Sequence, residues 1–156
     1  SSPMFPVSPC GCPTYLGSEP RKITEEFLWK RLRKSKPLRW PFPEMASPKL
    51  FASGNVLFVS GQVGEDIQGN IPKGIEAQVE LAIENARRIL RAAGSDLDKV
   101  LMCRCFLQKQ EDFAGMNQVY FKYFGDAKVG PARYTVVAPP VADCYLFEIA
   151  MFAVVE

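Results

Sequence analysis

The chain of 156 residues contains no histidine. This absence excludes the Ser-His-Asp and Cys-His triads, every histidine general base and the commonest zinc ligand sets. The sequence also lacks a run of about 18 apolar residues, which a membrane-spanning helix would need, so no membrane partner is expected. An enzyme with this sequence would have to work with carboxylates, hydroxyls, arginine, thiols and backbone dipoles.

Other signatures of binding chemistry are missing as well. The glycine patterns of phosphate loops and dinucleotide sites are absent, and no group of carboxylates resembles a magnesium site, so neither a cofactor nor a metal is expected. The basic run 31–36, with Trp29 and Trp40 nearby, is the one feature suited to nucleic acid. We interpret it as a solvated or packed arm, because the net charge of the chain is only +2.

The five cysteines are Cys10, Cys12, Cys103, Cys105 and Cys144. An odd number cannot pair completely within one chain. Cys103 and Cys105 fall in the apolar run 100–107 and are predicted to be buried and reduced. Cys10-Gly-Cys12 lacks a second pair of metal ligands, and we interpret it as two free thiols. This usage favours a reducing compartment, expected to be the cytoplasm, although the basic N-terminal stretch leaves organelle targeting open.

The composition changes near Pro48. The first 48 residues hold 9 of the 13 prolines, both tryptophans and 8 of the 19 Lys and Arg residues, but only 4 of the 17 Asp and Glu residues. We therefore divide the chain into a Pro-rich basic N-terminal extension, 1–48, and a folded domain, 49–156. Within the extension, residues 24–33 are predicted to form a short helix with Thr24 as its N-cap.

Regular hydrophobic periodicity begins after residue 49. Strands are predicted over 55–63, 100–107, 133–138 and 145–155, helices over 75–93 and 112–124, and a loop over 64–74. This order predicts an α+β domain with one mixed β-sheet and two helices packed on one face. The other face would be uncovered and apolar, so an oligomer is expected.

Two charged residues stand out in these strands. Arg133 follows a proline turn at the start of a strand, where its guanidinium is suited to grip a carboxylate in bidentate fashion; an inter-subunit salt bridge is the equal alternative. Glu148 is a single carboxylate in an apolar strand, on the opposite face from Phe147 and Ile149. It is interpreted either as a group of raised pKa that holds or protonates a ligand, or as a partly exposed residue of an edge strand.

Two uncharged positions are also candidates. Gly61 follows Ser60 near the end of the first strand, where a glycine allows a ligand or another backbone to approach closely; a β-bulge is the alternative reading. Asn117 lies in the middle of the second helix, where we expect it to anchor a loop by side-chain hydrogen bonds rather than to catalyse.

Several motifs together resemble one family. The segment 54–62, Gly-Asn-Val-Leu-Phe-Val-Ser-Gly-Gln, resembles the first-strand signature of the Rid (YjgF-like, reactive intermediate deaminase) family. Further matches follow in the family's order: Gly69 to Pro72, Gln78, Glu84-Asn85 with Ile89-Leu90, Ala93 to Leu97, Phe113 with Met116-Asn117, Tyr120, Tyr123-Phe124, Pro131-Ala132-Arg133 and Glu148-Ile149-Ala150. The resemblance covers about residues 50–156.

The resemblance implies a chorismate-mutase-like α+β fold, assembled as a homotrimer with three inter-subunit clefts. Family members with this arginine hydrolyse enamines and imines to 2-keto acids and ammonia without a metal or cofactor. The resemblance implies that Arg133 grips the carboxylate of a 2-imino or 2-keto acid and that Glu148 positions the attacking water. The other residues that it places in or near the pocket are Ser60, Gly61, Asn117 and Thr135, with backbone N–H groups beside Gly61 and Thr135 adding polar contacts.

Two departures from the family pattern bear on activity. Ser47 stands where the family has a pocket tyrosine, and Phe51 or an aromatic residue of the extension is the candidate replacement. Tyr134-Thr135 follow Arg133, where active members often have a small residue and a cysteine. Two alternatives stay open: a non-catalytic trimer that binds a carboxylate metabolite, and a ribonuclease or translation inhibitor, which the missing histidine disfavours.

Overall fold

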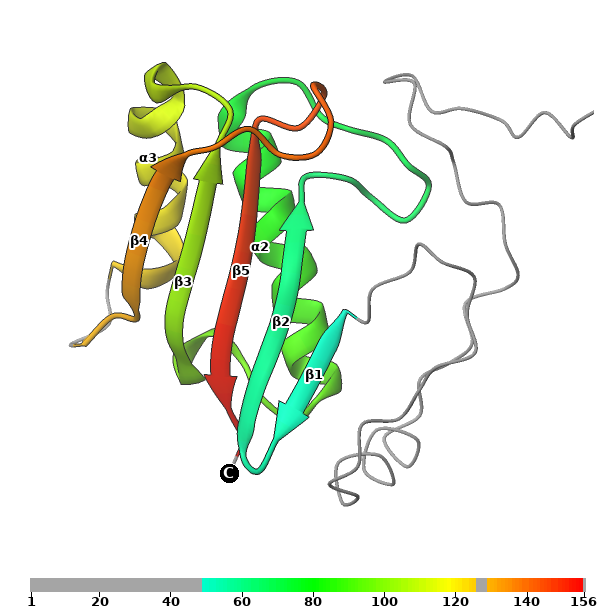
Figure 1. Cartoon of the computed structure of the whole chain (residues 1–156), viewed down its shortest axis with the longest axis vertical. Helices are drawn as coiled ribbons and strands as arrows, with labels where there is room; N and C mark the ends of the chain where they lie inside the picture. The colour runs from blue at the N-terminus through cyan, green and yellow to red at the C-terminus, as the bar shows by residue number, and fades with distance from the viewer. Residues whose placement is uncertain (1–48, 126–128, 156) are drawn as a thin grey trace, which may run out of the picture.

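The structure is a computed structural model that describes residues 49–125 and 129–155. Its elements are β1 (Leu50–Ser53), β2 (Val56–Val63), α2 (Ile75–Ala92), a 3₁₀ turn (Leu97–Lys99), β3 (Val100–Leu107), a second 3₁₀ turn (Gln110–Asp112), α3 (Phe113–Phe124), β4 (Ala132–Val137) and β5 (Phe147–Val154). One sheet has the strand order β1-β2-β5-β3-β4 (Figure 1). Strands β3 and β4 are parallel and the other pairs antiparallel, which confirms the predicted mixed sheet. The predicted helix over 24–33 lies outside the described residues, as do Ser47 and the first two cysteines.

Strand β1 is an addition to the predicted strands. It has only four residues, too few for a clear alternation, and it forms because it pairs with β2 in a hairpin, with Leu50 opposite Val59 and Ser53 opposite Val56. The predicted turn at 53–55 is confirmed, and Gly54 adopts a φ of 61° there. The bounds of the other strands and both helices differ from the prediction by two residues at most.

Both helices cover the same face of the sheet (Figure 1). The apolar residues of α2 recur at helical spacing, so that Ile83 and Leu90 are fully buried. They pack in one core with Leu57 of β2 and with Phe147 and Met151 of β5. No helix in the described part of the chain is long and apolar enough to cross a membrane.

The other face of the sheet carries exposed apolar side chains, as predicted. Phe51 of β1 is 58% exposed, and its partner Phe58 on β2 is also exposed. Tyr134 and Val136 of β4 are exposed in the same way. These side chains alternate along their strands with residues that face the helices, so they gather on the open face.

Candidate functional site

Glu148 lies on the open face of the sheet. The alternation of β5 is strict: its neighbours Phe147 and Ile149 are fully buried under the helices, whereas Glu148 is only partly exposed on the other side. Its partners in the sheet are Val63 on β2 and Phe106 on β3, so it occupies a central strand. Burial raises the pKa of Glu148 above its ordinary value. The structure therefore contradicts the edge-strand reading and places a partly desolvated carboxylate in the middle of the sheet.

A β-bulge brings the chain close to this carboxylate. The register between β2 and β5 shifts between Val59 and Gln62, so that Ser60 and Gly61 together oppose one residue of β5. A Cβ atom at position 61 would overlap the Glu148 Oε1 atom, so the carboxylate lies directly against the glycine backbone. The bulge and the close approach, which the sequence offered as alternatives for Gly61, are the same feature.

Neighbouring hydrogen bonds hold the bulge in place. The Gln62 Nε2 group donates to the carbonyl oxygens of Ser60 and Gly61 at 3.1 and 2.9 Å. The Ser60 hydroxyl donates to the carbonyl oxygen of Lys49 at 3.2 Å. The backbone that faces Glu148 is thus fixed from both sides of the bulge.

Glu148 and the bulge form one end of an open groove of about 410 Å³. Its walls are aromatic, from Phe51, Phe58, Phe106 and Phe152, and its remaining lining residues are Val59, Ser60, Gly61, Arg104, Glu148 and Ala150. Phe51, the candidate replacement for the missing family tyrosine, therefore lies in the same groove as Glu148. A groove with apolar walls and a few polar groups at one end is typical of a small-molecule site.

Arg133 lies on the other side of the sheet. It pairs with the fully buried Cys103 in the parallel register of β3 and β4, and its side chain faces α3. Its Nη1 group donates to the Asn117 Oδ1 atom at 2.8 Å, and its Cζ atom lies 4.5 Å from the centre of the Tyr120 ring. Asn117 therefore has the anchoring role expected of it, and what it anchors is the arginine rather than a loop. In the described part of the chain no carboxylate lies within ion-pair distance of Arg133.

Thr135 lies two residues further along β4, on the same side as Arg133. It pairs with Cys105, and its hydroxyl is buried without a hydrogen-bond partner in the described residues. Cys103 and Cys105 are free and fully buried, as predicted, and burial raises their pKa values to about 11 and about 12. Arg133 lowers both pKa values, but burial outweighs its effect, so both thiols stay protonated at neutral pH.

The six candidate residues thus fall into two groups. Ser60, Gly61 and Glu148 belong to the open face, and Arg133, Asn117 and Thr135 belong to the helix side of the edge strand β4. Strand β3 lies between β4 and β5, so the two groups differ both in face and in position along the sheet. We call these two groups the half-sites of the candidate site, and within one chain the arginine does not meet the glutamate.

The sequence reasoning missed Arg104. It lies between Cys103 and Cys105 in an apolar run, and the two-residue period of a strand could have shown that it faces away from them. In the structure Arg104 lines the groove together with Glu148. No three Cys, Asp or Glu side chains are grouped as metal ligands anywhere in residues 49–125 and 129–155.

Comparisons with known proteins agree on one family. A sequence profile of the Endoribonuclease L-PSP family matches residues 47–155. A RutC family protein of Pyrococcus horikoshii is 41% identical over 106 residues, which cover 67% of this chain and 82% of the relative. The 2-iminobutanoate/2-iminopropanoate deaminase of Mus musculus is 34% identical over 86 residues, which cover 54% of this chain and 64% of that protein.

A solved structure agrees with the fold. The crystal structure of E. coli TdcF with bound serine is 28% identical and superposes with a TM-score of 0.67, covering 74% of this chain and 93% of that chain. The mixed five-stranded sheet with two helices on one face has the chorismate-mutase-like arrangement that the sequence motifs implied.

Proposed function

The chain belongs to the Endoribonuclease L-PSP family, the Rid or YjgF-like family that its motifs resemble, and we propose that it hydrolyses reactive 2-imino acids and enamines to 2-keto acids and ammonia. We place this reaction in the inter-subunit clefts of a homotrimer. The observation that carries the proposal is the division of the candidate residues into two half-sites on opposite faces of the sheet. One chain offers Glu148 to one neighbour and Arg133 to another.

The exposed apolar face supports the assembly. In a monomer, a broad apolar surface would stay in contact with water, which costs free energy. This surface is formed by Phe51, Phe58, Tyr134 and Val136. A second copy that packs its β4 edge near this face would cover it. The same contact would bring the Arg133 half-site of that copy toward the groove that holds Glu148.

Arg133 has the setting of a carboxylate clamp. Asn117 engages one N–H of its guanidinium, and the rings of Tyr120 and Phe121 lie 4.5 and 5.5 Å from its Cζ atom, so its orientation is fixed before a ligand arrives. The remaining N–H donors are available for the two oxygens of a substrate carboxylate. A held carboxylate fixes the adjacent C2 atom in space, which is the first requirement of the reaction.

Glu148 supplies the proton transfers. Its carboxylate accepts a proton from a water molecule while the water oxygen bonds to C2 of the imino acid, and the same proton is then passed to the nitrogen. The carboxylate then takes the remaining proton from the new C2 hydroxyl and passes it to the nitrogen as the C2–N bond breaks. Ammonia leaves and the oxygen becomes the keto group, so one water is consumed and no oxidant or reductant is needed. A raised pKa suits this double role, because the group must both take and give a proton near neutral pH.

The activity is tested with an imino acid made in place. Threonine dehydratase acting on threonine releases the enamine and imine of butanoate, and the rate of 2-oxobutanoate release is measured with and without the protein. Arg133→Ala should lower the acceleration about 100-fold, because the substrate is no longer oriented. Arg88→Ala, which removes an exposed arginine of α2, is the matched control and should keep the wild-type rate. Wild-type protein that adds nothing to the uncatalysed rate would reject the proposal.

Mixed oligomers test the composite cleft. Arg133→Ala and Glu148→Gln are each expected to be inactive alone, but co-expressed chains would form trimers in which some clefts combine an intact arginine with an intact glutamate. Random mixing in equal amounts makes about a quarter of the clefts intact, so about a quarter of the wild-type activity should return. A site contained within one chain would give no recovery.

A second candidate function is a trimer that binds a carboxylate metabolite without turning it over. It is favoured by the solved TdcF structure, which holds serine, and by Ser47 in the place of the family's pocket tyrosine. Tight binding of 2-oxobutanoate without acceleration of imine hydrolysis would support this function over the first. We further propose a reducing compartment, the cytoplasm, in keeping with the free thiols of Cys103 and Cys105.

A further inference from the structure

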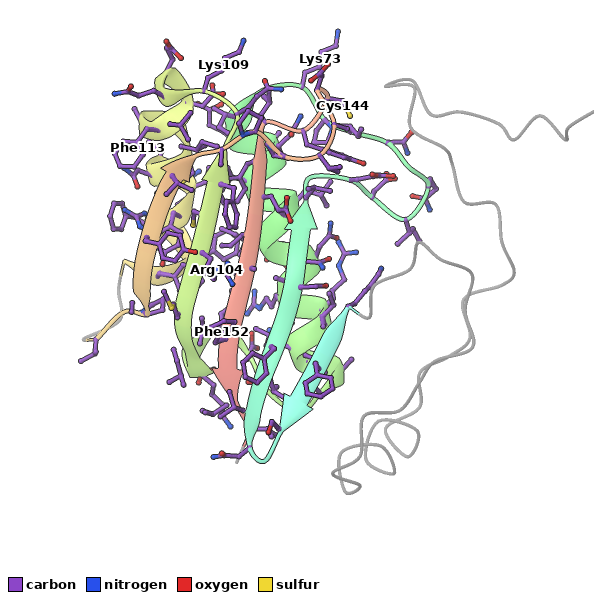
Figure 2. All side chains as sticks on the ribbon, viewed as in Figure 1. Lys73, Arg104, Lys109, Phe113, Cys144 and Phe152 are labelled. Carbon is purple, nitrogen blue, oxygen red and sulfur yellow. The ribbon has the colours of Figure 1, made fainter. Side chains whose placement is uncertain are left out.

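Arg104 projects from the middle of β3 on the open face of the sheet, and Figure 2 shows it on the same side as Phe152. Its Nε group donates to the Tyr134 hydroxyl at 2.8 Å. Its Cζ atom lies 5.9 Å from the ring centres of Phe106 and Tyr134 and 6.0 Å from that of Phe152. Three aromatic rings and one hydrogen bond thus orient a partly exposed guanidinium.

The guanidinium has no anionic partner in the described part of the chain. Only Nε is engaged, so the N–H groups of both terminal nitrogens remain available as a fork for a carboxylate. A cation held beside apolar walls interacts with an anion more strongly than one in free solution. The position therefore has the features of an anion subsite, with the orientation of the fork set by Tyr134.

Arg104 and Glu148 lie in the same groove without touching. Arg104 is opposite Ala150 in the register of β3 and β5, and Glu148 is two residues from Ala150 on the same face of β5. Such diagonal neighbours are about 7–8 Å apart. No ion pair joins them, because the hydrogen bond to Tyr134 draws the arginine toward β4. The small side chain of Ala150 leaves the space between them open.

We propose that Arg104 binds a second carboxylate of the substrate, so that the groove selects 2-imino dicarboxylic acids over 2-imino acids with an alkyl side chain. The inference rests on the proposed function: Arg133 of a neighbouring copy would hold the carboxylate next to C2, and Glu148 would serve the reacting carbon. The distal carboxylate, two or three carbons from C2, would then reach toward Arg104. The hydrolysis itself is unchanged, since the second carboxylate takes no part in bond making or breaking.

Binding of stable keto acids tests the subsite apart from turnover. 2-Oxoglutarate and 2-oxopentanoate have the same five-carbon chain and differ at the end that Arg104 would bind. Calorimetric titration of the full chain should give a dissociation constant about 10- to 100-fold lower for 2-oxoglutarate, as expected for hydrogen bonds to a charged group. Arg104→Met should bring this ratio close to one, while Arg88→Met on α2 should leave it unchanged.

Two further variants keep the test decisive. Tyr134→Phe retains the charge of Arg104 but removes the hydrogen bond that orients its guanidinium, so the ratio of the two dissociation constants should fall severalfold. Arg104→Lys should also lower this ratio, and it takes the place of Arg104→Met if the methionine variant does not fold. A wild-type ratio near one, or a high ratio that the Arg104 variants leave intact, overturns the inference. So does a change of oligomeric state in Arg104→Met without any change of ratio, which would assign Arg104 to a carboxylate of a second copy.

Turnover separates the inference from the function on which it rests. An oxidase acting on glutamate supplies 2-iminoglutarate, to be compared with 2-iminobutanoate. Hydrolysis of both at equal kcat/KM leaves the proposed function standing and rejects the role of Arg104. If 2-oxoglutarate binds more tightly than 2-oxopentanoate through Arg104 but neither imino acid is hydrolysed, the anion subsite is supported and the proposed hydrolytic function is rejected.

Discussion

Replacing Gly61 with alanine should separate the chemistry of the site from the stability of the fold. A Cβ atom at position 61 would overlap the Glu148 Oε1 atom and would lie 2.7 Å from its Cδ atom. The three atoms nearest to it all belong to that one flexible side chain, and the φ of Gly61 is not in the left-handed region. Alanine therefore fits the backbone, and the carboxylate is what moves.

The magnitudes follow from this geometry. The carboxylate must shift by an ångström or more, and a misplacement of about 1 Å can cost roughly 100-fold in rate. Loss of glycine entropy in the unfolded chain contributes about 0.4–1 kcal/mol of stability, which offsets the repacking of Glu148. Gly61→Ala should thus lower kcat/KM about 100-fold while its free energy of unfolding in urea stays within about 1 kcal/mol of wild type.

Gly64→Ala is the matched comparison. A Cβ atom there would lie 2.6 Å from the Gln78 Cα atom, which belongs to the backbone of α2 and cannot swing aside. This overpacking should cost about 1–3 kcal/mol of stability. The two glycines are three residues apart in sequence, at the end of β2 and directly after it, yet one variant should lose rate and the other stability.

A double mutant shows whether Gly61 acts through Glu148. Glu148→Gln alone should lose about 100- to 10,000-fold in rate. If the glycine serves only to seat the carboxylate, adding Gly61→Ala should lower the rate no further, because the interaction is already gone. Full additivity of the two losses would refute the reasoning, as would a Gly61→Ala enzyme with wild-type kcat/KM.

Three further predictions follow from the site. Because burial raises the pKa of Glu148, the acidic limb of kcat against pH, which reports the substrate-bound enzyme, should lie above the ordinary glutamate value of 4.5, and Glu148→Gln should lack it. Asn117→Ala removes the 2.8 Å bond to Arg133 and should lower kcat/KM about tenfold, mainly through KM, whereas Ala at the exposed Gln118 should not. Iodoacetamide at pH 8 should leave Cys103 and Cys105 unmodified, as peptide mass spectrometry would show, until urea unfolds the chain; rapid labelling of the native protein would contradict their burial.

The sequence predicted most of the fold because its signals are local. The apolar spacing of α2 and the alternation of β5 each depend on a single segment, and both were correct. The alternation also placed Glu148 correctly on the face away from Phe147. Strand β1 was missed because its four residues form a strand only by pairing with β2. The sequence of these four residues alone does not predict that pairing.

Arg133 marks the limit of local reasoning. Its face is set by the parallel pairing of β4 with β3, a contact between segments separated by the whole of α3. The sequence showed that the arginine begins a strand, but the face on which it emerges depends on that distant register. The division into two half-sites could therefore be seen only in the folded chain.

The two readings of Arg133, a carboxylate clamp and an inter-subunit salt bridge, describe successive states of one cleft in the proposed trimer. With no substrate bound, the nearest carboxylate to Arg133 of one copy would be Glu148 of the next, since the described part of its own chain offers none. A substrate carboxylate would take that place and leave Glu148 without its cation. The pKa of Glu148 would then rise as the substrate binds, which prepares the group to exchange a proton with water when the imine is in position. Arg133 would thus both orient the substrate and set the pKa of Glu148, the general base.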